Sequence, residues 1–384
     1  MVFVWLRYVP SKIKKGINQM RRWLTIFPDL KKEHLNKDVG LIPEIMQYEG
    51  KYKSSILTIN RESDVSEYTS CNVIEIDENK LGKKISIAKY LIKNAKQYDV
   101  INMYHFSLSE ALLWVLPYKM RNPKGKVYLK MDLSTKYMHD YTNNKIMLFL
   151  RKMVLPLYSL ITVESSIVCD YVNKYYKNKV KLIPNGYYWG TNSLLINKNR
   201  KNEILYVARI GADCKRTEIL IEAFERTLNQ HNWMLHLVGP MEDSFKLWYE
   251  KKLDANSSLK DRIIYDGAIY DRERIEKLYD ETKIFSLCSE YESFGIVLIE
   301  ALSKGAYLIA TEGINSSRDI IKNKNIGLIT KTNDVNDLAR NILKAINAEE
   351  IFDDDKVEFR IQYAKEKYLW TNICKKINHF LDGD

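Results

Sequence analysis

Paired cysteines and long apolar runs are both missing from this sequence. Its five cysteines lie far apart and include no Cys-x-x-Cys pair, which excludes the common zinc spacings and gives no disulfide framework. We therefore expect a protein of the reducing cytoplasm. No uninterrupted apolar stretch reaches the length of about 18 residues that a membrane-spanning helix needs. The nearest candidate, residues 146–163, is broken by Arg151, Lys152 and Pro156, and predicts a helix followed by a strand.

Acidic residues are scarce in one half of the chain. Residues 1–200 hold 33 Lys and Arg against 17 Asp and Glu, a balance of +16, whereas residues 201–384 hold 27 against 32, a balance of −5. Such an asymmetry indicates that the first half faces an anionic partner. Solvated surface lysines are the alternative, but they do not explain why the two halves differ. No helix-turn-helix, zinc-finger or aromatic RNA-binding signature is present, so we expect no nucleic-acid partner.

The basic character begins in the first 37 residues, which carry nine Lys and Arg interleaved with apolar and aromatic side chains. Such a segment can lie on an anionic membrane surface, each cation contributing on the order of 1 kcal/mol. A strand and helix packed on the domain is the alternative, and Pro10 prevents one continuous helix. We expect a cytoplasmic protein that binds peripherally to the inner face of the cell membrane.

Short apolar runs alternate with helical stripes along the chain, which predicts an α/β fold with parallel sheets. The runs predict strands at residues 23–27, 55–59, 73–76, 100–104, 127–131, 160–163 and 180–183 in the first half, and at 204–208, 233–238, 262–265, 284–288, 306–310 and 326–329 in the second. A polar stretch after Pro184-Asn185-Gly186 predicts a linker. We expect domains at residues 1–190 and 203–360, a linker at 191–202, and a final helix within 361–384 that packs on a domain surface.

The most informative stretch lies just after the predicted strand 284–288. Glu292 stands in a loop, and Glu300 follows with seven residues between them. Gly295 lies where the loop turns into a helix, so the amides of Phe294, Gly295 and Ile296 would be free to bind an anion, beside Ser293. Glu300 could then accept hydrogen bonds from a ribose diol, with Glu292 nearer a sugar. An ordinary surface turn and helix is the alternative for either glutamate alone.

A second stretch follows the predicted strand 204–208. Arg209 falls at the end of that strand and Lys215 in the loop before the next helix. Two permanent cations beside a helix N-terminus would bind a diphosphate and stabilise its charge as it leaves. A strand-end arginine can also be a plain surface residue, and only the glutamate stretch downstream favours the binding interpretation.

Together these stretches resemble the retaining family 4 glycosyltransferases, whose GT-B fold consists of two facing Rossmann-like domains. Pro184-Asn185-Gly186 looks like the tripeptide that ends the family's N-terminal domain. The resemblance covers about residues 98–380 and is specific across 203–305. It implies that Arg209 and Lys215 contact the donor diphosphate, and that Glu300 binds the ribose. It further implies that Glu292 positions the sugar and that the Phe294–Ile296 amides hold the sugar and the phosphate. Resemblance to this family also implies a role in surface-polysaccharide biosynthesis.

Three departures from the family pattern are present. Ala208 and Arg216 stand where glycine is common, and the strand 126–132 ends in Lys130-Met131-Asp132 where the family often places a histidine. Asp132 could make the polar contact with the sugar but cannot supply imidazole chemistry. His105, after the preceding strand, is a second candidate; a lone histidine is more often structural.

On the acceptor side, the family's glycine-rich loop is missing, and residues 34–41 take its place. Gly40 could let backbone approach a phosphate there, with Lys37 and Asp38 near an acceptor. A helix N-terminus capped by Asn36 or Asp38 is an equal alternative.

We therefore expect a retaining hexosyltransferase that moves a sugar from a nucleotide-diphosphate donor, a UDP-sugar rather than a GDP-sugar, to a glycan or lipid-diphosphate-linked acceptor. We expect no cofactor and no metal, because Arg209, Lys215 and helix amides can compensate the charge. The acidic run 353–355 lies in a polar stretch and is expected to be solvated. Alternatives are a catalytically weak binding subunit of a glycosylation complex and a sugar-nucleotide epimerase on the same fold.

Overall fold

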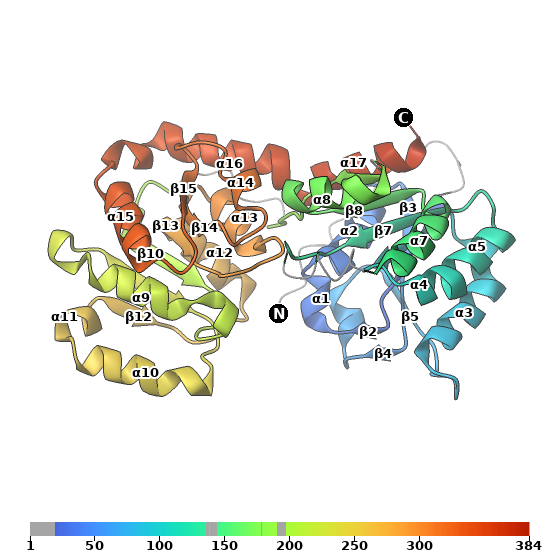
Figure 1. The fold of residues 1–384 in the computed structure, drawn as a ribbon, viewed down its shortest axis with the longest axis horizontal. Helices are drawn as coiled ribbons and strands as arrows, with labels where there is room; N and C mark the ends of the chain where they lie inside the picture. Colours follow the sequence, from blue (N-terminus) through green and yellow to red (C-terminus); the bar gives the residue numbers. More distant parts are fainter. Residues whose placement is uncertain (1–19, 136–137, 139–143, 178, 190–196, 384) are drawn as a thin grey trace. The chain divides into compact units, whose positions relative to one another are not determined.

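The structure, a computed structural model, describes residues 20–135, 138, 144–177, 179–189 and 197–383. The chain divides into two compact units (Figure 1). Unit 1 comprises Met1–Glu164, Val168–Asn185 and Trp370–Asp384, and unit 2 comprises Ser165–Ile167 and Gly186–Leu369. Residues 1–19 of the basic segment 1–37 lie outside the described residues, as do residues 191–196 of the predicted linker.

Unit 1 is built on a parallel sheet in the order β5-β3-β1-β6-β7-β8-β9. Its strands are β1 (Arg21–Ile26), β3 (Tyr52–Thr58), β5 (Asn72–Glu75), β6 (Val100–Tyr104), β7 (Lys126–Met131), β8 (Leu160–Val163) and β9 (Val180–Leu182), and a small sheet pairs β2 (Asp29–Leu30) with β4 (Asn60–Arg61). The helices are α1 (Lys32–Leu35), α2 (Asp38–Tyr48), α3 (Lys83–Asn94), α4 (Leu108–Glu110), α5 (Leu116–Arg121), α7 (Lys145–Val154), α8 (Ser166–Tyr176) and α17 (Trp370–Asp382).

The two faces of the unit 1 sheet differ in character. Leu24, Ile101 and Leu129 belong to a large apolar core on one face. The next residues along β6 and β7, Asn102 and Lys130, are polar and also buried. Because successive side chains of a strand point to opposite faces, the second face carries buried polar groups.

Unit 2 is built on a second parallel sheet in the order β12-β11-β10-β13-β14-β15. Its strands are β10 (Lys201–Val207), β11 (Met234–Val238), β12 (Ile263–Tyr265), β13 (Thr282–Leu287), β14 (Tyr307–Thr311) and β15 (Gly327–Thr330). Its helices are α9 (Thr217–Glu225), α10 (Asp243–Asp254), α11 (Ser257–Lys260), α12 (Arg272–Glu281), α13 (Ile296–Ser303), α14 (Ser317–Ile320), α15 (Val335–Ile346) and α16 (Asp354–Tyr368). The four central strands β11, β10, β13 and β14 are almost wholly buried, as expected for a parallel sheet covered on both faces.

The predicted strands all appear, with bounds within a few residues of the apolar runs. The chain passes from unit 1 to unit 2 at Asn185 and Gly186, a few residues before the expected boundary near residue 190. The last helix, α17, which we expected to pack on a domain surface, belongs to unit 1. The α17 helix carries Trp370, Ile373 and Ile377, which are at most 1% exposed. They are buried because the chain returns from unit 2 to unit 1 at this helix.

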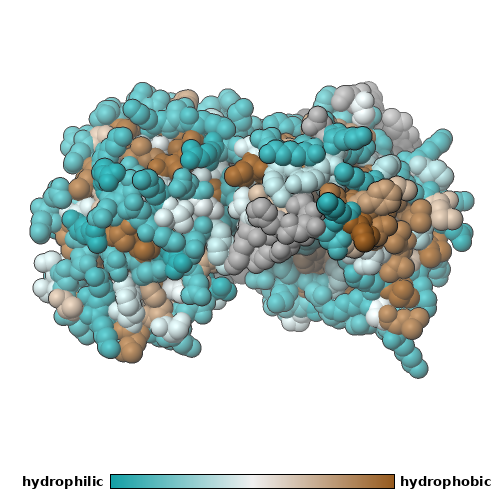
Figure 2. Space-filling view, viewed as in Figure 1, coloured by the Kyte–Doolittle hydropathy of each residue, from teal (hydrophilic) through white to brown (hydrophobic). Residues whose placement is uncertain are grey.

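The surface is mixed in polarity. Among the described residues, every helix is too short or too polar to span a bilayer. Hydrophilic residues cover much of the face shown in Figure 2, whereas hydrophobic residues gather over α7.

Candidate functional site

The two stretches singled out from the sequence follow neighbouring strands of unit 2. Residues 208–216 follow β10 and residues 288–295 follow β13, and these strands pair in parallel. Because the carboxyl ends of parallel strands meet at one edge, both loops lie where open α/β sheets bind ligands. The loops are also tied together, since the amide of Glu290 donates to the carbonyl of Cys214 over 2.8 Å.

Lys215 and Glu292 are brought into direct contact. The Lys215 ammonium donates to Glu292 Oε2, and both side chains are about one-fifth exposed, at 22% and 23%. The carbonyl of Lys215 accepts from the buried Tyr206 hydroxyl over 2.7 Å. The backbone of Glu292 is held on both sides, because its amide donates to Gly313 and its carbonyl accepts from Asn315. The pair is therefore fixed by backbone contacts yet open to a ligand.

Arg209 does not join that pair. Its guanidinium lies 2.9 Å from Glu242, and its side chain is 63% exposed. The predicted pairing of two cations on one diphosphate therefore requires Arg209 to exchange Glu242 for a ligand. Glu242, at the start of α10, is a functional candidate that our sequence analysis missed.

Gly295 forms the junction between the loop and α13. Its φ of 75° lies in the left-handed region, which glycine adopts without strain. The first helical amides, those of Ile296 and Val297, have no acceptor within the helix. They and the α13 dipole favour an anion at this end. The sequence analysis placed the start of this helix correctly and named the amides of Phe294, Gly295 and Ile296, of which Ile296 is the first residue of α13.

Ser293 and Phe294 contribute in different ways. Ser293 is half-buried in the loop, whereas the Phe294 ring is 1% exposed and packs against Tyr368. The carbonyl of Phe294 accepts from the Ser316 hydroxyl. Only the backbone of Phe294 is thus left for a ligand, as the sequence analysis expected.

Glu300 is more enclosed than expected. It is 7% exposed, and its two carboxylate oxygens contact the Arg272 guanidinium at 3.0 Å and the Tyr279 hydroxyl at 3.2 Å. Burial and the nearby Glu300 raise the pKa of Tyr279 well above its usual value, so this hydroxyl stays a donor. Arg272 also stacks on Trp189, 4.3 Å from the ring centre. Each carboxylate oxygen retains a second lone pair for a ligand hydroxyl.

Sequence reasoning missed Arg272 and Tyr279. A signal was available, because Arg272 begins the helix that follows β12, at the same carboxyl edge as the two loops. Arg216, one of the departures from the family pattern, has a φ of 49°. The left-handed backbone explains why glycine is common at this position. The Arg216 guanidinium pairs with Glu290, which closes this side of the loop.

The carboxyl edge of the unit 1 sheet carries a buried ionic cluster. The Lys130 side chain is 1% exposed, lies 3.0 Å from Asp38 Oδ2 and contacts Glu164 Oε1. The side-chain amide nitrogen of Asn185, Nδ2, donates to the same Glu164 oxygen over 2.7 Å. Burial alone would lower the pKa of Lys130, but Asp38 and Glu164 outweigh it and hold that pKa above its usual value. Burial raises the pKa of Glu164, against the effect of Lys130.

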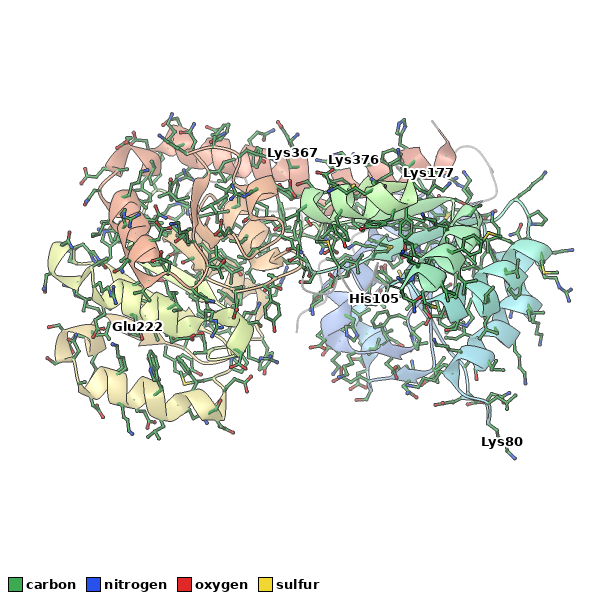
Figure 3. All side chains as sticks on the ribbon, in the orientation of Figure 1. Lys80, His105, Lys177, Glu222, Lys367 and Lys376 are labelled. Atoms are coloured by element: carbon green, nitrogen blue, oxygen red, sulfur yellow. The ribbon has the colours of Figure 1, made fainter. Side chains whose placement is uncertain are left out.

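The two predicted catalytic residues of unit 1 lie beside this cluster. His105, labelled in Figure 3, is exposed, and its amide donates to the carbonyl of Lys130 over 3.1 Å. Its φ of 56° is unusual for a residue with a side chain. Asp132, two residues after Lys130, is exposed and electrostatically raises the pKa of Glu164. Both side chains are open to a ligand.

The acceptor-side loop is corrected by the structure. Gly40 lies inside α2 rather than in a loop, and a Cβ there would be 2.4 Å from Leu35 Cα. Glycine is needed at this position for α1 to pack on α2, not for a phosphate to approach. The helix N-terminus is observed, but its N-cap is the exposed Lys37 rather than Asn36 or Asp38. Asp38 instead serves Lys130.

Metal-binding clusters of three or more His, Cys, Asp or Glu are absent from the described residues. Asp353 is the N-cap of α16, and its two acidic neighbours pair with lysines: Asp354 with Lys198 and Asp355 with Lys356. The acidic run is thus a helix start with largely exposed side chains.

Part of the chain resembles known proteins in sequence. Residues 194–367 match the family described as glycosyl transferases group 1. Residues of this chain are 26% identical, over 60% of the chain and 64% of the relative, to the GalNAc-alpha-(1->4)-GalNAc-alpha-(1->3)-diNAcBac-PP-undecaprenol alpha-1,4-N-acetyl-D-galactosaminyltransferase of Campylobacter jejuni. They are 26% identical to the lipopolysaccharide 1,6-galactosyltransferase of Escherichia coli, over 43% and 45% of the two chains. The matches thus span less than two thirds of these relatives.

Solved structures resemble the whole chain. The Anabaena protein HepE in complex with UDP has a TM-score of 0.73 at 15% identity, covering 95% of this chain and 100% of HepE. The lipopolysaccharide outer core galactosyltransferase WaaB has a TM-score of 0.69 at 15% identity, covering 94% and 99%. The predicted α/β fold with two Rossmann-like sheets, the GT-B fold, is confirmed.

Proposed function

We propose that this protein, whose residues 194–367 match the glycosyl transferases group 1 family, transfers a hexose from a UDP-sugar to a glycan or lipid-diphosphate-linked acceptor. The observation that carries the proposal is the contact between Lys215 and Glu292 beside the α13 N-terminus. Two neighbouring stretches of unit 2 offer a cation there, together with a carboxylate and free amides, which match the diphosphate and sugar of one donor.

In the proposed reaction, the bond between the sugar C1 and the donor phosphate breaks, and a bond from C1 to the acceptor oxygen forms. The acceptor proton leaves with the diphosphate. Lys215 and the α13 amides stabilise the charge that develops on the departing diphosphate, and Arg209 joins them by releasing Glu242. Glu292 orients the sugar. This charge compensation requires no metal ion.

Glu300 is proposed to bind the ribose, with Arg272 and Tyr279 as positioning residues. Their hydrogen bonds fix the rotamer of the carboxylate, so that its remaining lone pairs face one direction. Retention of the anomeric configuration is proposed from the resemblance to family 4 enzymes. UDP in the HepE complex and undecaprenol diphosphate in the name of the Campylobacter relative support the donor and acceptor classes.

On the acceptor side, Asp132 and His105 are proposed to contact the transferred sugar or the acceptor hydroxyl, because both are exposed beside the Lys130 cluster. Lys37 would contribute charge nearby. Since Asp38 is already engaged by Lys130, its proposed role is to hold that cluster rather than to bind the acceptor. With a lipid-linked acceptor, the enzyme would act at the inner face of the cell membrane.

The test is a panel of UDP- and GDP-sugars, assayed for transfer and for hydrolysis with and without a chelator. We expect turnover with a UDP-sugar, unchanged by chelation, and a fall in kcat/KM on the order of 100-fold for Lys215→Gln. Lys246→Gln is the matched control, because Lys246 is also ion-paired in unit 2 but 55% exposed on α10. Turnover that requires a divalent metal would contradict metal independence.

Two other outcomes would replace the proposal. Donor binding or partner binding without turnover would favour a binding subunit, and conversion of the donor without an acceptor would favour an epimerase. NMR of the first-formed product would show whether the anomeric configuration is retained or inverted.

A further inference from the structure

The α7 helix of unit 1 exposes an apolar face. Ile146, Phe149, Leu150 and Met153 are 72%, 61%, 39% and 65% exposed. Spacings of three, one and three residues place these four side chains on one side of a helix. We call this set the α7 face.

The α7 face is not needed to attach α7 to unit 1. Val154 is buried and Leu148 packs against the apolar core, so a different side of the helix anchors it. Single exposed apolar residues are common, but four large ones on one helix face mark an interaction site. Hydrophobic residues are visibly gathered over α7 in Figure 2.

The apolar surface extends beyond α7. The α4 helix contacts α7, and the helical segment that continues α4 into α5 carries three more exposed apolar side chains at four-residue spacing. These are Leu112 at 48%, Leu116 at 37% and Met120 at 73% exposure.

The charged residues that α7 itself carries are all basic. No Asp or Glu occurs between Asp140 and Glu164. Lys145 and Lys152 are exposed, and at 100° per residue both lie along one edge of the face, next to Phe149. Lysines at that edge can reach lipid phosphates while the apolar side chains enter the layer beneath them.

We propose that the α7 face docks on an anionic lipid bilayer. Ile146, Phe149, Leu150 and Met153 insert at the boundary between headgroups and acyl chains, and Lys145 and Lys152 bind the phosphates. A second copy of this chain is a poorer occupant of the α7 face. In an antiparallel two-fold contact, Lys145 of each copy would lie near Lys152 of the other, and these like charges would repel.

The docking face has a consequence for substrate access. The α7 helix follows β7 in the chain, so its Lys145 end lies toward the carboxyl edge of the unit 1 sheet. That edge carries His105 and Asp132. A bilayer bound to α7 therefore lies near the edge where an acceptor attached to a lipid would arrive. The docking proposal itself rests on α7 and is independent of the transfer reaction.

The test is flotation of the full-length protein with vesicles of phosphatidylcholine alone or mixed with phosphatidylglycerol, without donor or acceptor. We expect recovery with the anionic vesicles, and a partition coefficient lower by on the order of tenfold or more for Phe149→Ser/Met153→Ser. Lys145→Glu/Lys152→Glu should abolish the preference for anionic lipid. Leu247→Ser is the matched control, since Leu247 is 60% exposed on α10 of unit 2.

Because all the substituted side chains are exposed, circular dichroism and the Tm should match the wild type. Equal recovery of the wild type and Phe149→Ser/Met153→Ser would overturn the proposal. The proposal would also be overturned if Phe149→Ser/Met153→Ser changed the oligomeric mass in light scattering but left lipid binding intact. That result would identify the α7 face as a contact between copies of the chain. Failure of the transfer assay with normal flotation would affect the proposed function alone.

Discussion

Lys130 carries a permanent charge inside unit 1 and relies on two carboxylates for its stability there. Removing a charged partner from such a cluster leaves the other charges buried and uncompensated, which costs more than the cluster contributes. The cluster also joins three separate parts of the chain, since Asp38 begins α2, Glu164 follows β8 and Asn185 ends the unit 1 segment. Its role is therefore to position these segments at the carboxyl edge.

We predict that Lys130→Met lowers the free energy of unfolding by about 3–5 kcal/mol, measured by urea denaturation. Lys53→Met is the control, because Lys53 is exposed on β3 of the same sheet. Adding Asp38→Asn and Glu164→Gln to the Lys130 variant should restore much of the loss. Equal destabilisation by the two single lysine substitutions would show that the buried charge has no special role.

His236 on β11 gives the stability of unit 2 a pH dependence. Its Nδ1 lies 2.9 Å from Glu203 and its Nε2 3.3 Å from Asp266. Burial lowers the pKa of His236, but these carboxylates outweigh it, and the net shift is upward from 6.5. Because the folded state holds the proton more tightly, this stabilisation is complete below about pH 6.5 and is lost as pH rises through the folded-state pKa.

We therefore predict a Tm for unit 2 that falls as the pH rises above about 6.5, with a shallower fall in His236→Gln. Glutamine keeps a hydrogen bond to Glu203 without the titrating group. Differential scanning calorimetry across that range measures both profiles. Parallel profiles for the variant and the wild type would assign the slope to other groups.

At the scale of an element, α13 depends on the backbone of the residue before it. A Cβ on Gly295 would lie 3.3 Å from both Leu287 and Leu298, and its φ of 75° disfavours any side chain. A substitution would strain the turn and shift the first amides of the helix. Gly295 thus controls both the turn into α13 and the position of the α13 amides that are proposed to bind an anion.

We predict that Gly295→Ala costs about 1–2 kcal/mol of stability and also weakens UDP binding, measured by calorimetric titration. Gly82→Ala is the matched control, because Gly82 has a φ of 93° at the start of α3 and open space around it. The control should lose stability without losing affinity. Unchanged UDP affinity in Gly295→Ala would remove the α13 amides from the donor site.

In the molecule as a whole, unit 1 is assembled from three segments of the chain, the last of which follows unit 2. The α17 helix returns after unit 2, and its Trp370, Ile373 and Ile377 are buried in unit 1. The carbonyl of Leu381 accepts from Lys126 at the start of β7. Unit 1 is therefore incomplete until the residues of α17 have been synthesised.

We predict that a chain ending at Leu369 retains the calorimetric transition of unit 2 and loses that of unit 1, because several large apolar side chains no longer cover the sheet. Limited proteolysis should then degrade residues 20–185 first. Phe380→Ser, at a site 37% exposed on α17, is the control that should keep both transitions. Two intact transitions in the truncated chain would show that α17 is dispensable.

The strands, and the loops proposed to bind the donor, could be located from the sequence alone. Val100–Tyr104 and Leu160–Val163 have the predicted bounds, because strands buried on both faces are rich in apolar residues. Glu292 and Gly295 were predictable for a related reason, since a loop after a strand and a glycine before a helix are features of neighbouring residues.

Which residues from distant parts of the chain lie in contact depends on the tertiary structure. The pairing of Glu300 with Arg272, the engagement of Asp38 by Lys130 and the return of α17 to unit 1 join segments far apart in the chain. Gly40 was misjudged for a more local reason: the atoms that exclude its Cβ belong to Leu35 on the preceding helix, and how α1 packs on α2 cannot be read from periodicity. Periodicity shows that a side chain is buried or charged, whereas its partner depends on how the elements pack.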